Sequence, residues 1–257
     1  MKKILLVFFA LFIIMKMFVG CGINKSDYEL ALITDFDILE DKSFNQGAWE
    51  GLKKYADEHN KTFQYYQPSE GTNKAYLESI EIAVKSGAKV IVTPGSLFAV
   101  TIYEAQVKYP EVKFILLDGE PHTEDYKTYR TEKNVLPILY AEEEAGFMAG
   151  YAAVKDGFTK LGFQGDMAVP SAIRYGHGFA QGAEVAAKEL ELAEGSVSLI
   201  YNYSGDFSPS PESKARAVQW YKDGTEIILA CTDAASNSVI AAADEVGGKF
   251  VIGVNVD

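Results

Sequence analysis

The order in which short apolar runs and helical patterns follow one another is the feature that most limits the fold of this chain. From Tyr28 onward, runs rich in β-branched and aromatic residues alternate with stretches in which apolar residues recur at helical spacing. Strands that alternate with helices pair in parallel sheets through right-handed crossovers. We therefore expect an α/β fold. The expected strands are Leu30–Thr34, Thr62–Tyr66, Val90–Thr93, Lys113–Leu117, Val135–Leu139, Lys160–Phe163, Val197–Tyr203, Glu226–Ala230 and Phe250–Val254.

The composition of individual runs supports parallel sheets. Val90–Val92 and Phe114–Leu117 are apolar throughout, as expected of strands that helices cover on both faces. One of the intervening helical stripes is formed by Ala48, Leu52, Tyr55 and Ala56. In open α/β sheets, ligands bind beyond the carboxyl ends of the strands, so a binding site is expected there.

The alternation is interrupted once, and this interruption divides the chain. Residues 118–133 are polar, with charges and tyrosines but no helical stripe. A length of 257 residues is long for one ordinary domain and sufficient for two. We expect a first lobe at residues 28–140, a second lobe at residues 141–257, and a crossing between them near Pro137–Ala141.

The first residues have the pattern of an export signal. Lys2 and Lys3 precede the apolar stretch Ile4–Met15, which is too short for a comfortable membrane span, and residues 1–20 are predicted to be a signal peptide. The following Phe18–Cys21 resembles a bacterial lipobox, in which cleavage leaves a lipidated N-terminal cysteine. We expect Cys21 to anchor the protein to the extracytoplasmic side of the cell membrane, with residues 21–27 as a tether. Cleavage without lipidation and a simple membrane anchor are the alternatives.

Composition excludes several classes of function. The net charge of −12 makes nucleic acid a poor partner, because an acidic surface repels phosphates. Two cysteines and three scattered histidines give no metal-ligand spacing, and no cofactor or metal is expected. Cys231 is interpreted as a small buried strand residue.

Acidic and aromatic residues stand at the expected strand ends. Asp35 follows the first strand, and Asp118 follows the fourth. Ser43 and Gln46 have the spacing of a capping box at the start of the next helix, so a well-capped turn would account for them. Capping does not explain Phe44 in the first turn, where an aromatic ring offers a flat face to a planar ligand.

At this point the chain resembles a known family. The stretch "ITDFDILEDKSFNQGAWEGL" is similar to the opening signature of the basic membrane protein family, the PnrA-like substrate-binding lipoproteins of ABC transporters. The segments "NVLPILYAEEEAGFMAGYAA", "LGFQGDMAVPSAIRYGHGFAQG", "YNYSGDF" and "KFVIGVNVD" follow in the order of that family's motifs. The resemblance implies a type I periplasmic-binding-protein fold, in which two Rossmann-like lobes close on a ligand. It also implies a receptor that passes a small molecule to an ABC permease, without catalytic residues, and we expect a monomer.

The resemblance also implies roles for particular residues. In the purine-nucleoside receptors of the family two phenylalanines enclose the base, and Phe44 and Phe207 fall on those positions. The positions that bind the edge of the base fall on Asp35, Asn45 and Asp118. The ribose position falls on Asn255 or Asp257, between which the alignment does not choose.

Departures from the family pattern leave the ligand open between a purine nucleoside and another heterocycle such as a flavin. The D-x-G of the family is replaced by Asp35-Phe36-Asp37, and Asn255 stands where aspartate is usual. The resemblance further implies that about a hundred residues of the family's length are missing after Asp257, so the chain is expected to be a fragment.

Several single motifs allow more than one interpretation. The glycines of Gly176–Gly182 have the wrong spacing for a dinucleotide fingerprint and are better explained by close packing of a helix on a sheet. Arg174 is interpreted as a salt bridge that braces the lobe, with a ligand contact as the alternative. Tyr175 and Phe98 are candidate cavity walls or core residues. An acidic cluster of Asp35, Asp37, Glu40 and Asp41 leaves a metal-dependent nucleosidase as the alternative of another class, and an adhesion or signalling lipoprotein is a third.

Overall fold

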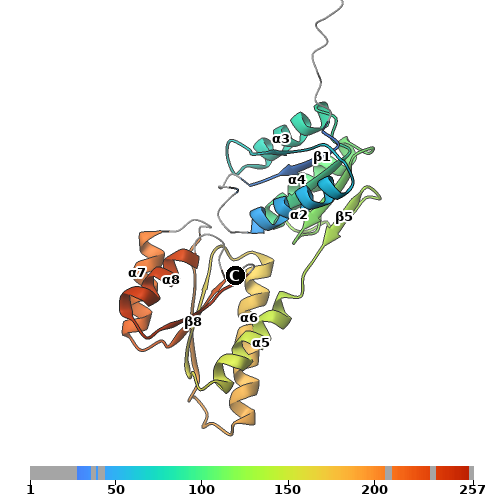
Figure 1. Cartoon of the computed structure of the whole chain (residues 1–257). Coiled ribbons are helices and arrows are strands. Elements are labelled where there is room, and N and C mark those ends of the chain that lie inside the picture. Colours follow the sequence, from blue (N-terminus) through green and yellow to red (C-terminus); the bar gives the residue numbers. More distant parts are fainter. Residues whose placement is uncertain (1–27, 36–38, 40–43, 206–209, 232–235, 255–257) are drawn as a thin grey trace, which may run out of the picture.

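The computed structural model describes residues 28–35, 39, 44–205, 210–231 and 236–254, which form two lobes, each built on its own parallel sheet (Figure 1). The predictions for the signal peptide and for Cys21 lie outside the described residues. No helix among the described residues is long and apolar enough to span a membrane.

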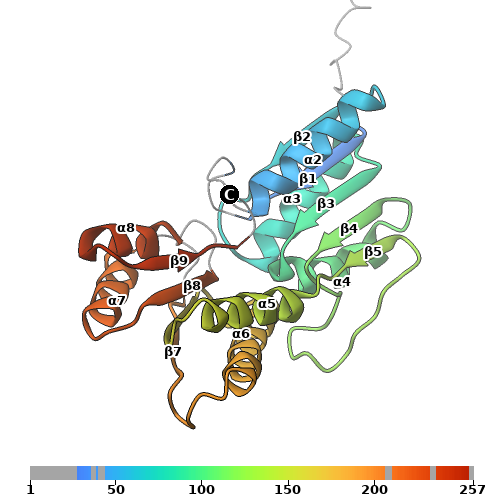
Figure 2. The ribbon, with the colours of Figure 1, turned by 60° about the horizontal axis from the view of Figure 1, so that its bottom comes forward.

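The first lobe contains a five-stranded parallel sheet in the order β2-β1-β3-β4-β5, and Figure 2 shows these strands side by side in that order. Its strands are β1 (Leu30–Ile33), β2 (Phe63–Tyr66), β3 (Val90–Pro94), β4 (Lys113–Leu117) and β5 (Val135–Ile138). Its helices are α2 (Phe44–Glu58), α3 (Asn73–Lys85), α4 (Ala99–Lys108) and the short η1 (Ser96–Phe98). Apolar side chains of α3 and α4 pack on one face of the sheet, and those of α2 pack on the other.

The second lobe repeats this plan with a four-stranded sheet in the order β7-β6-β8-β9. Its strands are β6 (Lys160–Gly165), β7 (Ser198–Tyr203), β8 (Ile227–Cys231) and β9 (Phe250–Ile252). The helices α5 (Glu142–Lys155) and α6 (Pro170–Glu189) cover one face, and α7 (Pro211–Lys222) and α8 (Ser236–Val246) cover the other. The chain passes from the first sheet to the second between β5 and α5, as Figure 1 shows.

The strand and helix pattern of the sequence is therefore confirmed. Each of the nine expected runs overlaps a strand, with β3, β6 and β8 ending one or two residues later than expected, and all strand pairs within the two sheets are parallel. The polar interval 118–133 has no named helix or strand, and its His122 and Tyr129 form an isolated bridge. It is tied down at its end by buried Asn134, whose amide donates hydrogen bonds to the carbonyls of Gln106, Tyr109 and Val112 at 3.0–3.2 Å.

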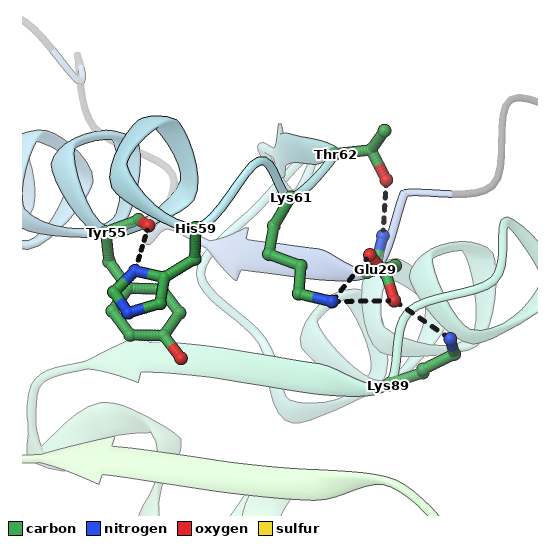
Figure 3. A network of polar contacts seen from close by, with 6 residues as sticks. All are labelled: Glu29, Tyr55, His59, Lys61, Thr62 and Lys89. Carbon is green, nitrogen blue, oxygen red and sulfur yellow. Dashed lines mark hydrogen bonds and ion pairs between the residues drawn. The ribbon is translucent and has the colours of Figure 1, made fainter.

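The amino ends of the first-lobe strands are held by an ion network around Glu29 (Figure 3). The Glu29 carboxylate lies 2.9 Å from the Lys89 ammonium and 3.3 Å from that of Lys61, and its backbone N–H donates to Thr62 Oγ1 at 3.0 Å. Hydrogen bonds from Lys89 and then Lys61 lower the pKa of Glu29. This network joins the starts of β1, β2 and β3 at the edge opposite their carboxyl ends, so its role is structural.

Glycines allow α5 and α6 to approach until their backbones touch. A Cβ added at Gly182 would lie 1.9 Å from the Phe147 carbonyl oxygen, and one at Gly150 would lie 2.0 Å from that of Phe179. A side chain at either position would force the helices apart. The sequence-based explanation by helix–sheet packing holds for Gly176, which faces the Phe163 ring, but Gly182 serves contact between helices.

Candidate functional site

A cavity of about 670 Å³ lies between the carboxyl ends of the strands of the two lobes. Its volume is within the usual range of small-molecule sites. The first lobe contributes the carboxyl ends of β1, β3 and β4 and the first turns of α2. The second contributes Asp166 after β6, Cys231 at the end of β8, Val254 after β9, and the first turns of α5 and α6. Parallel topology places all these ends at one edge of each sheet, so residues far apart in the sequence meet here.

In the first lobe, a hydrogen-bonded amide and carboxylate stand beside an aromatic ring. The Asn45 amide donates to Asp35 Oδ2 at 2.8 Å, which fixes both side chains. Asn45 is buried although it lies in the first turn of α2. The neighbouring Phe44 ring meets Tyr140 edge to face, with centroids 6.2 Å apart. The ring faces of this pair are therefore not stacked on one another.

In the second lobe, the lining is polar and partly acidic. Glu142 in the first turn of α5 and Asp166 after β6 are both buried. Ser171 and Tyr175 lie in the first turns of α6, and burial raises the pKa of the Tyr175 hydroxyl. Cys231 ends β8 and is buried, as expected of a small buried strand residue.

Arg174 of α6 joins the two lobes through carboxylates. Its Nε lies 2.7 Å from Glu142 Oε2 in the same lobe, and its Nη2 lies 3.6 Å from Asp118 Oδ1 in the other lobe. The more exposed Glu143 is also within 3.6 Å. The bracing interpretation of Arg174 is thus correct for Glu142, and the contact with Asp118 extends it across the cavity.

Asp118 is held in an unusual backbone conformation. Its φ of 58° is in the left-handed region, which an aspartate tolerates better than most residues, and its N–H donates to the Ile138 carbonyl at 2.7 Å. Burial raises the pKa of its carboxyl to about 7. The Ser171 hydroxyl and Arg174 oppose this rise in pKa, and the Glu142 carboxyl adds to it. Oδ1 is buried and accepts no hydrogen bond from the described residues.

The structure brings together the predicted residues that it describes. Asp35, Phe44, Asn45 and Asp118 all line the one cavity. Phe207, Asn255 and Asp257 lie outside the described residues. Their roles in binding, like those of the four residues in the cavity, stay predictions.

The structure also bears on the two candidate wall residues and on the acidic cluster. Tyr175 lines the cavity, whereas Phe98 is fully buried in the first-lobe core against Tyr76 and is not a wall. In the nucleosidase cluster, Asp37, Glu40 and Asp41 lie outside the described residues. Among the described residues, no group of three His, Cys, Asp or Glu side chains could hold a metal ion.

Some lining residues were not found from the sequence. Asp166 follows the strand Lys160–Gly165, so the strand-end rule that identified Asp35 and Asp118 would have identified it as well. Glu142 is one of three consecutive glutamates, and nothing in that run shows which of them is buried. Tyr140 belongs to the crossing segment, for which the sequence offers no periodic signal.

Comparison with known proteins identifies the type of architecture to which this cavity belongs. The model of the family described as "ABC transporter substrate-binding protein PnrA-like" matches residues 29–257. A nucleoside-binding protein of an ABC transporter from Lactococcus lactis subsp. cremoris is 27% identical over 248 residues, which cover 92% of this chain and 66% of that protein. Basic membrane protein A of Borreliella burgdorferi is 26% identical over 260 residues, covering 100% of this chain and 72% of that protein.

Solved structures agree with the fold. A solute-binding protein of an ABC transporter system from Aeropyrum pernix K1 superposes with a TM-score of 0.72 at 22% identity, over 87% of this chain and 61% of that one. The myo-inositol-binding protein of Caulobacter gives a TM-score of 0.62 at 15% identity, over 88% and 74%. The fold is thus that of type I periplasmic binding proteins. The chain spans about two thirds of the length of the curated relatives that it matches.

Proposed function

Because the chain belongs to the PnrA-like family of ABC transporter substrate-binding proteins, we propose that it captures a purine nucleoside between its lobes and delivers it to a permease. The observation that carries the proposal is the grouping of Phe44, the bonded pair Asp35 and Asn45, and Asp118 around one cavity. The nucleoside-binding relative from Lactococcus lactis subsp. cremoris supports this ligand class.

Each of these groups suits a part of a purine. A ring face such as that of Phe44 stacks on a base and contributes about 1–3 kcal/mol per base, whichever base it is. Carboxylates accept hydrogen bonds from ring and amino N–H groups, and these contacts distinguish one base from another. Because the Asn45 amide fixes Asp35, that carboxylate is aimed before the ligand arrives. In the proposal, Phe207 covers the other face of the base, and Asn255 or Asp257 holds the ribose.

The charge of the cavity favours an unphosphorylated ligand. Asp35, Asp118, Glu142 and Asp166 line it, and Arg174 beside it is already paired with carboxylates. Among the described lining residues a phosphate group would meet this acidic wall and no lysine or arginine, so nucleosides are expected to bind and nucleotides to be rejected. Riboflavin is the second heterocycle that such a wall would accept.

The remaining parts of the proposal concern location and transport. Export by residues 1–20 and lipidation of Cys21 would hold the receptor on the extracytoplasmic face of the membrane, beside its permease. Closure of the two lobes on the ligand, about the crossing between β5 and α5, would form the surface that the permease recognises. A Cys21→Ala variant, followed by mass spectrometry of the membrane-associated protein, tests the lipid attachment: the wild type should carry a diacylglyceryl group and the variant none.

The decisive experiment measures binding directly. The full chain is titrated calorimetrically with inosine, adenosine, guanosine, uridine, AMP, riboflavin and myo-inositol. We expect a purine nucleoside to bind and AMP to bind more weakly, and a ligand at about 100 times its Kd should stabilise the protein by about 2.7 kcal/mol. Tight binding of riboflavin or myo-inositol with none of a nucleoside would refute the ligand assignment. Release of free base on incubation with inosine and Mg²⁺ would show a nucleosidase instead.

A further inference from the structure

The contact between Arg174 and Asp118 has a geometry that a simple bracing salt bridge would not have. Arg174 reaches its partner within the second lobe, Glu142, at 2.7 Å, and Glu142 is 4% exposed. Its distance of 3.6 Å to Asp118 Oδ1 is too long for a hydrogen bond. Glu142 therefore holds the guanidinium in place. Asp118 lies within the field of its positive charge, and Oδ1 of Asp118 remains available to accept a hydrogen bond.

The surroundings of Asp118 exert opposing influences on the pKa of its carboxyl. The charged and titratable groups that interact with it are Glu142 of α5, Arg174 and Tyr175 of α6, and Tyr140 of the crossing segment, while Glu143 contacts only Arg174 among these groups. Burial and Glu142 favour the neutral acid, whereas a hydrogen bond with the Ser171 hydroxyl and, to a smaller extent, the charge of Arg174 favour the carboxylate. Since the resulting pKa is about 7, the loss of any one of these influences, that of Arg174 included, changes how much of the carboxyl is ionised at neutral pH.

We propose that Arg174 is a positioning residue for ligand capture, which keeps the Asp118 carboxyl ionised so that Oδ1 accepts a hydrogen bond from an N–H group of the ligand. This inference rests on the proposed function. Glu142 has a part in the same arrangement, because it lies at the start of α5 and anchors the guanidinium there. The carboxylate that binds the ligand lies on one lobe and the cation that maintains it on the other, so capture depends on the lobes remaining close together.

A pH dependence of binding follows from this arrangement. A carboxyl with a pKa of about 7 is about half ionised at pH 7, so affinity should rise through neutral pH and level off above it. Removal of a neighbouring opposite charge raises a carboxyl pKa by about 1 unit at the lower end of the usual range, which suits a guanidinium already paired with Glu142, so Arg174→Gln should leave about a tenth of Asp118 ionised at pH 7. The variant should then bind about five-fold more weakly at pH 7 and approach the wild type only at higher pH.

The Glu142→Gln variant is expected to act in the opposite direction. It removes the carboxyl that raises the pKa of Asp118, through a side-chain hydrogen bond and then through its charge, and it frees the guanidinium to move toward Asp118. The midpoint of its pH profile should therefore fall. Arg174→Lys keeps the positive charge and should lie between the wild type and Arg174→Gln. If Arg174→Gln does not fold, Arg174→Lys tests the proposal, because a midpoint above that of the wild type is expected only if the guanidinium acts on Asp118.

The experiment measures the Kd of inosine by calorimetry from about pH 5.5 to about pH 9, the range over which such a carboxyl titrates. His177→Gln is the matched control, because His177 lies exposed on α6 three residues from Arg174 and does not line the cavity, and its profile should equal that of the wild type. Opposite displacements of the pH midpoint in Arg174→Gln and Glu142→Gln support the proposal. A pH-independent loss of affinity in both variants would overturn it and leave Arg174 as a structural brace.

A second measurement keeps this inference separate from the proposed function. In ligand-free protein labelled with ¹³C at aspartate carboxyls, the Asp118 resonance, assigned with Asp118→Asn, is followed against pH. Its midpoint should be near 7 in the wild type and higher in Arg174→Gln. An unchanged midpoint in the variant would refute the role of Arg174 whether or not a nucleoside binds. If inosine binds at no pH while the midpoint moves as expected, the ligand assignment fails and the control of Asp118 by Arg174 stands.

Discussion

The contact between α5 and α6 gives a prediction whose magnitude can be worked out from the structure. In Gly182→Ala the new Cβ would lie 1.9 Å from the Phe147 carbonyl oxygen, whereas real Cβ contacts are essentially never under 3.0 Å. The helices must therefore separate by about 1 Å, since both sides of this contact are backbone and no side chain can turn away. Separation would loosen the whole interface, because Gly146, Gly150 and Gly178 make equally close contacts along it.

Two opposing effects set the size of the change. Overpacking of this kind destabilises by about 1–3 kcal/mol, and a contact between two backbones belongs at the upper end. Replacement of glycine by alanine within a helix returns about 0.5–1 kcal/mol. We expect a net loss of about 2 kcal/mol, which for a chain of this size lowers the Tm by about 4–8 °C.

Thermal unfolding of ligand-free protein, followed by circular dichroism or calorimetry, measures this loss. Gly51→Ala is the matched control, because Gly51 is also within a helix but nothing lies within 4 Å of the added Cβ, so its Tm should rise slightly. If Gly182→Ala were as stable as the wild type, the close approach of the two helices would be refuted. Since α5 and α6 carry Glu142 and Arg174 at their cavity ends, nucleoside affinity should fall together with stability.

Three further predictions concern single side chains. Phe44→Ala should weaken nucleoside binding about five-fold to a hundred-fold, from the loss of about 1–3 kcal/mol of stacking, with little change in the Tm of ligand-free protein; an unchanged Kd in calorimetry would remove Phe44 from the site. Asp118→Asn should stabilise ligand-free protein at pH 8 but not at pH 4, because the folded-state pKa of Asp118 is raised above the unfolded value and the wild type therefore loses stability as the pH rises toward 7. Equal changes in Tm at both pH values would contradict this pH dependence. Asn134→Ala should lower stability to urea by about 2–3 kcal/mol, because it removes the donor to buried carbonyls of Gln106, Tyr109 and Val112; a loss below about 0.5 kcal/mol would show that these bonds are not all formed.

The fold could be predicted from the sequence because its signals are local. Strand and helix patterns repeat over a few residues, and the short helical crossovers between them permit parallel pairing and little else. From that topology it also followed that Asp35 and Asp118, at two strand ends, would lie at the same edge of the first sheet, which the structure confirms. The same reasoning applied to Asp166 would have added a second-lobe carboxylate.

Only the tertiary structure decided how the lobes meet. Arg174 and Asp118 are opposed because the α5–α6 pair ends at the cavity, and the angle of that pair depends on helix contacts that no periodic pattern encodes. Three-dimensional packing likewise decides which glutamate of the run after Ala141 is buried, and it places Phe98 in the core. The sequence thus determined which elements form and where their ends lie, since these depend on neighbouring residues. The partners of each charge across the cavity depend on the distances between lobes, and those exist only in the folded chain.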